Sequence, residues 1–238
     1  MSKIKVLIFD LDLTLCENYE RKRKAIERAL NKEIPRELVP YIRSDYVFDT
    51  ILAKMGIRTG KVSILKSAFQ HFFYDEDLFQ LDKPFKGAVE TLTRLAEDGY
   101  RIYYLTGRPI KKTAIDFITK YGFPQGTTYA EKVGVGESHK KVKLFSRILK
   151  DAGVEPSEAA AIGDLPGDAS AAEKVGIIAI GTYEGHPSGR EGLEEVCDLV
   201  IERIVDLPEA LHQVDSIVSN QVERYRTANY SNSNVPLE

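Results

Sequence analysis

The sequence contains little cysteine, little net charge and no long apolar run near its start. Its two cysteines, Cys16 and Cys197, lie far apart and in no CxxC or metal-type spacing, so we expect reduced thiols rather than a disulfide framework. The formal net charge of -3 provides no electrostatic reason to expect a nucleic acid or an anionic membrane surface as a partner. The first apolar run, Val6 to Phe9, is too short for the core of a signal peptide, so we expect a cytoplasmic protein.

Short apolar runs alternate with helical patterns along most of the chain. Residues 3–9 predict a buried strand, because the run is rich in Val, Ile, Leu and Phe and ends at a polar turn. Further strands are predicted at residues 100–105, 127–130, 159–162, 175–180 and 198–201. The helical patterns between them end at Gly99, Gly122 and Gly153, as helices often do. This alternation predicts an α/β fold, with a Rossmann-like parallel sheet between two layers of helices (αβα).

The stretch from residue 17 to residue 83, here called the helical insert, breaks this alternation. It contains helical patterns but no convincing strand, so we expect a small all-helical domain inserted after the first strand. The α/β core would then comprise residues 1–16 and 84–215. Residues 216–238 would hold the end of a C-terminal helix and a polar, disordered tail.

Polar side chains follow three of the predicted strands at the point where each strand ends. Asp10 and Asp12 follow the first strand, Thr106 follows the second, and Asp164 and Asp168 follow the strand at residues 159–162. Because ligands of open parallel sheets bind beyond the carboxyl ends of the strands, we expect these groups to lie close together. Hard divalent cations such as Mg²⁺ take carboxylate oxygens, together with water and substrate phosphate.

The same edge carries groups suited to a phosphate. Thr106 and Gly107 precede Pro109, which is suited to a first helical turn, so a hydroxyl and unpaired backbone amides are expected at a helix N-terminus. A lysine of the basic segment at residues 139–143 would neutralise further phosphate charge. One of the first two aspartates would attack phosphorus, and its neighbour would move the proton.

Together these motifs resemble those of the haloacid dehalogenase-like hydrolases, over nearly the whole chain. The matching residues are Asp10, Asp12 and Thr14 (DxDxT), Thr106, and Asp164 with Asp168 (GDxxxD). The resemblance implies that Asp10 is the nucleophile and Asp12 the general acid/base. It also implies that Mg²⁺ is held by Asp10, the Asp12 carbonyl oxygen and Asp164, with Asp168 as a ligand or in support. The helical insert stands at the position of the family's cap, which closes over the substrate.

Two positions depart from the usual family pattern. The motif lysine is matched best by Lys141, with Lys140 as the alternative, because the proline that often follows it is absent. Leu13 stands where many relatives have glycine. The aspartate at position 12 favours phosphoryl transfer over carbon–halogen cleavage, because the dehalogenases of the family lack it.

Other charged residues have simpler interpretations. The run from Arg21 to Lys24 is predicted to be a solvated helix face, paired with nearby glutamates. Arg108 either contacts substrate or forms an exposed ion pair. The four histidines, at positions 71, 139, 186 and 212, are scattered, so neither a zinc site nor a histidine nucleophile is expected.

These observations predict a Mg²⁺-dependent phosphatase that hydrolyses a small phosphorylated metabolite through an aspartyl-phosphate. A phosphomutase or phosphotransferase of the same family would use the same aspartates, and a non-catalytic member would only bind a phosphorylated ligand. A receiver-type signalling domain also combines acidic residues, a threonine and a lysine, but in a different order. The sequence identifies neither the substrate nor the oligomeric state.

Overall fold

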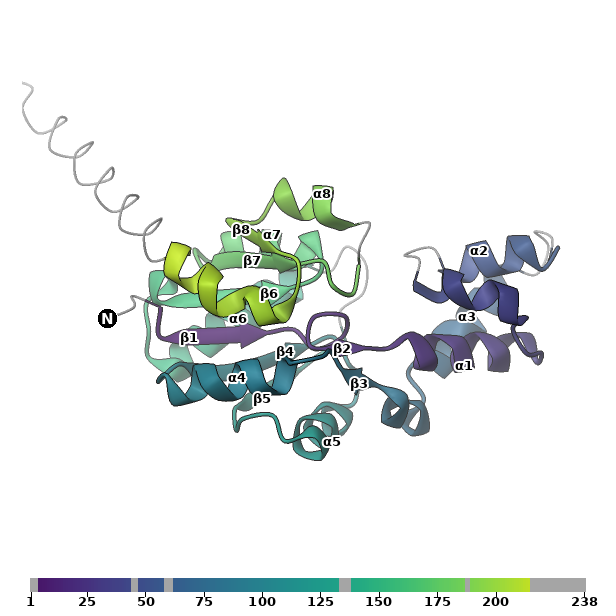
Figure 1. Ribbon diagram of the computed structural model, residues 1–238, viewed down its shortest axis with the longest axis horizontal. Coiled ribbons are helices and arrows are strands. Elements are labelled where there is room, and N and C mark those ends of the chain that lie inside the picture. Colours follow the sequence, from purple (N-terminus) through teal and green to yellow (C-terminus); the bar gives the residue numbers. More distant parts are fainter. Residues whose placement is uncertain (1–3, 44–46, 58–61, 133–137, 187–188, 215–238) are drawn as a thin grey trace, which may run out of the picture.

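The computed structural model describes residues 4–43, 47–57, 62–132, 138–186 and 189–214. Its main sheet has six parallel strands in the order β5-β4-β1-β6-β7-β8 (Figure 1). The strands are β1 (Val6–Phe9), β4 (Arg101–Thr106), β5 (Thr127–Ala130), β6 (Ala159–Gly163), β7 (Ile178–Thr182) and β8 (Leu199–Ile201). Since β1 lies between β4 and β6, the chain segments that follow these three strands are neighbours.

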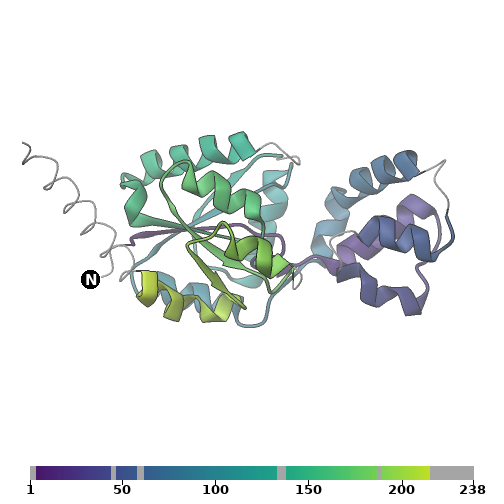
Figure 2. The ribbon, with the colours of Figure 1, turned by 90° about the horizontal axis from the view of Figure 1, so that it is seen from above.

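Helices cover both faces of this sheet. Leu7 and Phe9 of β1 belong to one hydrophobic cluster, and Val6 and Ile8 to the other, because successive side chains of a strand point to opposite faces. The first cluster is completed by α4 (Ala88–Glu97), α5 (Lys111–Tyr121) and helical residues 207–214, and the second by α6 (Ser138–Ala152) and α7 (Pro166–Glu173). A short helix, α8 (Arg190–Glu194), packs beside β7 and β8. The predicted three-layer α/β fold is therefore confirmed (Figure 2).

The helix ends follow the sequence pattern closely, and the strand ends less so. Gly99, Gly122 and Gly153 all have left-handed φ angles after their helices, as predicted. The strand predicted from residue 175 begins only at Ile178. Residues 175 and 176 close the turn after α7 instead, with Gly176 at φ 80°.

The helical insert forms a hydrophobic core of its own. It contains α1 (Tyr19–Leu30), α2 (Val47–Lys54), α3 (Val62–Phe73) and the 3₁₀ segments η1 (Arg36–Arg43) and η3 (Glu76–Leu81). Among the described residues of the insert, seven buried side chains make up this core: Ile26, Ile34, Leu38, Ile42, Phe48, Ile51 and Leu52. The insert lies beyond the carboxyl end of β1, beside the sheet rather than over one of its faces (Figures 1 and 2).

A short antiparallel ribbon joins the insert to the core. It pairs β2 (Cys16–Glu17) with β3 (Lys83–Pro84), whereas the sequence predicted no strand between residues 17 and 83. Two residues per strand are too few for a hydrophobic pattern to reveal. We propose this ribbon as the boundary between the two parts. The expected C-terminal segment at 216–238 lies outside the described residues. Within the described residues, no helix is both long and apolar enough to cross a membrane.

Candidate active site

The loop after β1 turns sharply, so that Asp10 and Asp12 end up in different surroundings. The Leu11 carbonyl accepts hydrogen bonds from the amides of Leu15 (2.9 Å) and Cys16 (3.1 Å). Leu13 within this turn has φ 65°, a left-handed conformation that suits glycine better than leucine. The left-handed turn is thus the physical difference between leucine and the glycine that the family resemblance leads one to expect at this position.

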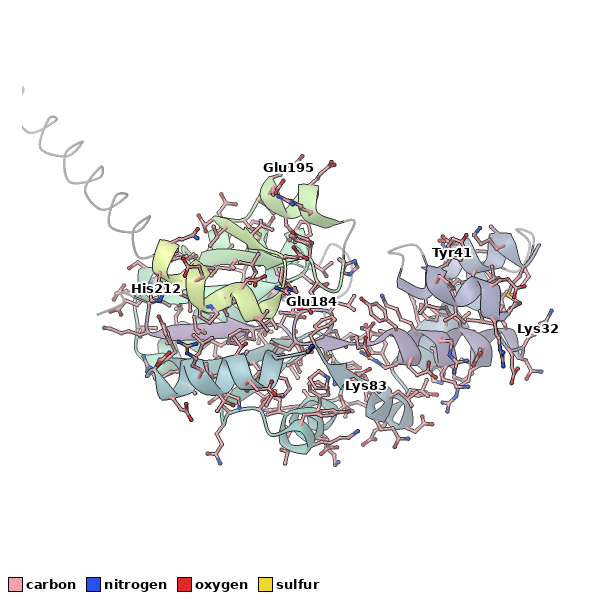
Figure 3. All side chains as sticks on the ribbon, in the orientation of Figure 1. Lys32, Tyr41, Lys83, Glu184, Glu195 and His212 are labelled. Atoms are coloured by element: carbon pink, nitrogen blue, oxygen red, sulfur yellow. The ribbon has the colours of Figure 1, made fainter. Side chains whose placement is uncertain are left out.

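Close packing against Gly185 accompanies the unusual conformation of Leu13. The Leu13 side chain is buried, and a Cβ atom added at Gly185 would lie 2.3 Å from the Leu13 carbonyl oxygen. Tyr19 of α1 donates a hydrogen bond to the Gly185 carbonyl (3.1 Å). Figure 3 shows the neighbouring Glu184, with Lys83 of β3, at the side of the core that faces the helical insert.

A Gly185→Ala substitution is expected to lower the free energy of unfolding by about 1–3 kcal/mol, because the new methyl group meets backbone that cannot move aside. Denaturant unfolding measures this effect. Gly189→Ala is the matched control, since its Cβ would meet only the His186 Cβ, at 3.4 Å. Equal stability of the two variants would contradict the close packing of Leu13 on Gly185.

Three carboxylates gather where β1 and β6 end. Oxygen atoms of Asp10, Asp164 and Asp168 lie within 4.8 Å of one another, and we call these residues the acidic cluster. Lys141 comes from α6, which packs on the same face of the sheet as α7; its Nζ lies 3.3 Å from Asp10 Oδ1, and it forms an ion pair with Asp168. Lys140 instead donates to the Lys132 carbonyl at the surface (3.2 Å). The structure therefore brings Lys141, and not Lys140, to Asp10.

Burial dominates the electrostatics of the acidic cluster. It raises the pKa of Asp10 well above the usual range, and the nearby Asp168 and Asp164 add to this, while Lys141 acts against it. Burial likewise raises the pKa of Asp168. For Lys141, burial by itself would lower the pKa, but Asp168 and Asp10 outweigh it and raise the pKa above the usual range. One cation among three carboxylates leaves negative charge to be compensated.

The acidic cluster fits a hard divalent cation. Asp164 Oδ2 and Asp168 Oδ2 are buried and accept no hydrogen bond from the described residues, although His186 Nε2 lies 3.2 Å from the first of them. Buried acceptors without a donor are rare in folded proteins. Oxygen atoms crowded in this way are what Mg²⁺ requires as ligands. The Thr14 hydroxyl (Oγ1) donates a hydrogen bond to the other carboxylate oxygen of Asp164, Oδ1 (3.2 Å).

The proposed phosphate-binding residues Thr106 and Gly107 lie at the end of β4, next to β1. Thr106 is the last residue of that strand and is buried, and its hydroxyl accepts a hydrogen bond from the Arg108 amide (3.2 Å). Gly107 has open space where a side chain would stand. The expectation that Pro109 starts a helix here is wrong, because α5 begins only at Lys111.

A second charged cluster lies beside the first and contains Asp12. Arg108 donates to both oxygens of Asp12, from Nε (2.9 Å) and from a terminal nitrogen (3.1 Å), and Arg21 pairs with the same carboxylate. Both arginines also pair with Asp82. We call Asp12, Arg21, Asp82 and Arg108 the hinge ion cluster, since its members come from either side of the β2–β3 ribbon.

The hinge ion cluster corrects two predictions. Arg21 is fully buried and does not belong to a solvated face, although Arg23 of the same run does pair with Glu20 and Glu27 as expected. Arg108 is ion-paired, but it is buried rather than exposed. The position of Arg21 on its helix could have indicated its burial, because Ala25, one turn later on the same helix face, is also buried.

The aspartates of the hinge ion cluster differ in electrostatics. Burial by itself would raise the pKa of Asp12, but Arg108 and Arg21 more than offset it and hold that pKa below the usual range. Burial raises the pKa of Asp82 to about 6, against the effect of Arg21. Asp82 and His186 carried no recognisable sequence motif, and only the fold places them beside the predicted residues.

Comparisons with known proteins identify the family to which this chain is similar. Residues 4–176 match the family model described as haloacid dehalogenase-like hydrolase. The glyceraldehyde 3-phosphate phosphatase of Pyrococcus furiosus is 28% identical over 233 residues, covering 90% of this chain and 95% of that protein. The phosphoglycolate phosphatase of Mannheimia succiniciproducens is 26% identical over 230 residues, covering 87% and 97%.

Solved structures agree on the fold. A haloacid dehalogenase-like family hydrolase from Streptococcus pneumoniae superimposes with a TM-score of 0.65 at 18% identity, covering 88% of this chain and 99% of that one. At that identity the likeness concerns the fold alone.

Proposed function

This chain belongs to the haloacid dehalogenase-like hydrolases, and from this premise we propose that it hydrolyses a small phosphate monoester through an aspartyl-phosphate, with Mg²⁺ as cofactor. The observation that carries the proposal is the acidic cluster at the end of β1, with Lys141 against Asp10. A nucleophilic carboxylate beside a buried lysine and further carboxylates is suited to phosphoryl transfer.

The first half-reaction would transfer the phosphoryl group to the enzyme. An oxygen of Asp10 attacks phosphorus, the bond from phosphorus to the leaving oxygen breaks, and Asp12 gives that oxygen its proton. Arg108 and Arg21 hold the pKa of Asp12 low in the free protein, so this role requires that the negative charge of the bound phosphate raise it. Lys141, with Thr106 and Gly107 at the end of β4, would bind the phosphoryl oxygens. In the second half-reaction Asp12 takes a proton from water, which attacks phosphorus and releases phosphate and the free Asp10 carboxylate.

Bound Mg²⁺ would supply positive charge that offsets the crowding of carboxylates and phosphate. Asp10, Asp164 and the Asp12 carbonyl oxygen are the proposed ligands, with Asp168 as a ligand or in support. The buried oxygens of Asp164 and Asp168 that accept no hydrogen bond from the described residues support this assignment.

The names of the relatives suggest where to look for the substrate. They are described as phosphatases of glyceraldehyde 3-phosphate and of phosphoglycolate, both short phosphorylated metabolites. We therefore propose a small phosphorylated metabolite of this kind.

Phosphate release from p-nitrophenyl phosphate, glyceraldehyde 3-phosphate and phosphoglycolate tests the function. We expect steady turnover with Mg²⁺, and at least about a hundredfold lower rate after treatment with EDTA, because the negative charge then lacks its counter-ion. Readdition of Mg²⁺ should restore the rate. Full activity in EDTA would contradict the metal requirement. Transfer of the phosphoryl group to an added sugar phosphate, in place of phosphate release, would favour the phosphomutase alternative.

A further inference from the structure

The hinge ion cluster holds four charged groups, of which Arg21, Asp82 and Arg108 are buried, and the proposed chemistry does not require all of them. Arg21 bonds Asp82 Oδ1 through Nε (2.9 Å) and also pairs with Asp12. Arg108 bonds Asp82 Oδ2 (2.8 Å) and both oxygens of Asp12. Each arginine therefore touches both aspartates, and the four formal charges cancel. A cluster without excess positive charge is poorly suited to bind an anionic substrate group.

The four residues come from four separate segments. Arg21 lies on α1 of the helical insert and Asp82 directly before β3, while Asp12 and Arg108 lie in the core loops after β1 and β4. The cluster therefore connects the insert to the loop that carries the proposed acid/base.

Aromatic rings hold the guanidinium groups in place. The Phe79 ring centroid lies 4.3 Å from Arg21 Cζ and 4.9 Å from Arg108 Cζ. Arg21 Cζ also lies 4.3 Å from the Phe73 ring centroid, and Arg108 Cζ lies 5.4 Å from the Phe117 ring centroid. Planar cations between rings and carboxylates have little freedom to reorient, so their hydrogen-bonding directions are preorganised.

The two aspartates are not equivalent members of this cluster. The Asp82 side chain is fully buried, whereas a quarter of the Asp12 side chain is exposed. Asp82 accepts hydrogen bonds from both arginines, so each guanidinium keeps a buried partner other than Asp12.

We propose that Arg21 and Arg108, anchored by Asp82, are positioning residues that aim the Asp12 carboxyl group during phosphoryl transfer. Because Arg21 belongs to the helical insert, the aim of Asp12 depends on how the insert sits on the core. This inference rests on the proposed function, in which Asp12 gives its proton to the leaving oxygen.

The basicity of the leaving group distinguishes positioning from a merely structural role. p-Nitrophenolate is a stabilised anion and departs with little help from an acid, whereas phenolate is more basic and needs the proton more. The value of kcat/KM reports the steps up to departure of the leaving group. A mispositioned Asp12 should therefore impair phenyl phosphate more than p-nitrophenyl phosphate, while partial unfolding would lower both values by the same factor.

The experiment compares the ratio of kcat/KM for p-nitrophenyl phosphate to that for phenyl phosphate, in the full chain with Mg²⁺. We expect the ratio to rise about tenfold in Arg21→Lys, Arg108→Lys and Asp12→Asn, which is part of what general acid catalysis contributes. Arg23→Lys, on the same helix but paired with Glu20 and Glu27, is the matched control and should leave the ratio unchanged. Within the Asp12→Asn background, the arginine substitutions should raise the ratio no further, because they act through Asp12.

The outcomes separate this inference from the function on which it rests. If the wild type is active and both arginine variants leave the ratio unchanged, the positioning role is overturned while the phosphatase assignment stands. An undiminished effect of the arginine variants in the Asp12→Asn background would overturn it as well. If the wild type releases phosphate from neither compound nor from the metabolites above, the proposed function fails and the inference fails with it. The ratio does not depend on the folded fraction, so a variant that folds only in part still gives a valid comparison as long as it turns over both compounds.

Discussion

The Asp10→Asn variant is expected to lose hydrolysis of p-nitrophenyl phosphate by about 10⁴-fold or more, since an amide cannot form the aspartyl-phosphate. The fold should persist. Because the pKa of Asp10 is raised by burial and by Asp168 and Asp164, its ionised form costs stability at any pH above the ordinary carboxyl pKa. A neutral amide removes that cost. Without Mg²⁺, the variant should therefore unfold at the same temperature as the wild type or a higher one.

Two measurements test this expectation, namely phosphate release with Mg²⁺ and thermal unfolding without it. Asp116→Asn, on the exposed side of α5 and paired with Lys112, is the control and should keep full activity. Turnover by Asp10→Asn comparable to that of the wild type would exclude Asp10 as the nucleophile. Loss of activity together with a much lower unfolding temperature would mean that the substitution damages the fold instead.

Lys141→Ala should lower phosphatase activity by about 10²–10³-fold, because the substitution removes the cation that faces both Asp10 and the developing phosphoryl charge. It should also lower the free energy of unfolding by about 3 kcal/mol without Mg²⁺, since Asp10 and Asp168 then lose their buried ion-pair partner. Lys140→Ala is the neighbouring control. Its amino group donates to the Lys132 carbonyl at the surface, so both effects should be small.

Steady-state kinetics and denaturant unfolding of the two lysine variants give a direct comparison. A larger loss in Lys140→Ala than in Lys141→Ala would place the motif lysine one position earlier. Equal and small losses of activity in both variants would show that neither lysine binds the phosphate.

Much of the fold was predictable because it depends on local patterns. The run VLIF is apolar on both sides of the chain, which is how a central parallel strand looks, and it forms β1 between β4 and β6. Apolar residues at helical spacing, followed by a glycine, located α4, α5 and α6 to within a few residues. Ends of neighbouring parallel strands meet by geometry. The convergence of Asp10 with Asp164 was therefore expected once both were found to follow strands of a parallel sheet, and the structure places those strands, β1 and β6, side by side.

Local patterns could not predict which of the long charged side chains are buried. Arg21 and Arg23 are two residues apart in one run of basic residues, yet the first is buried against Asp12 and Asp82 and the second pairs at the surface. Their different environments depend on which helix face meets the core, and that in turn depends on Phe73 and Phe79 packing around the guanidinium group. A charged side chain becomes buried only where partners from other segments satisfy it.

The chain's local sequence thus specified its layers, its helix ends and the residue types at the catalytic edge, because hydrophobic period and turn chemistry act over a few residues. The three-dimensional packing settled which lysine reaches Asp10 and how Leu13 keeps its left-handed turn against Gly185. It also brought Arg21, Asp82 and Arg108 around Asp12. Those relations join residues as much as 172 positions apart, such as Leu13 and Gly185, and their energies come from desolvation and pairing that exist only once the segments have met.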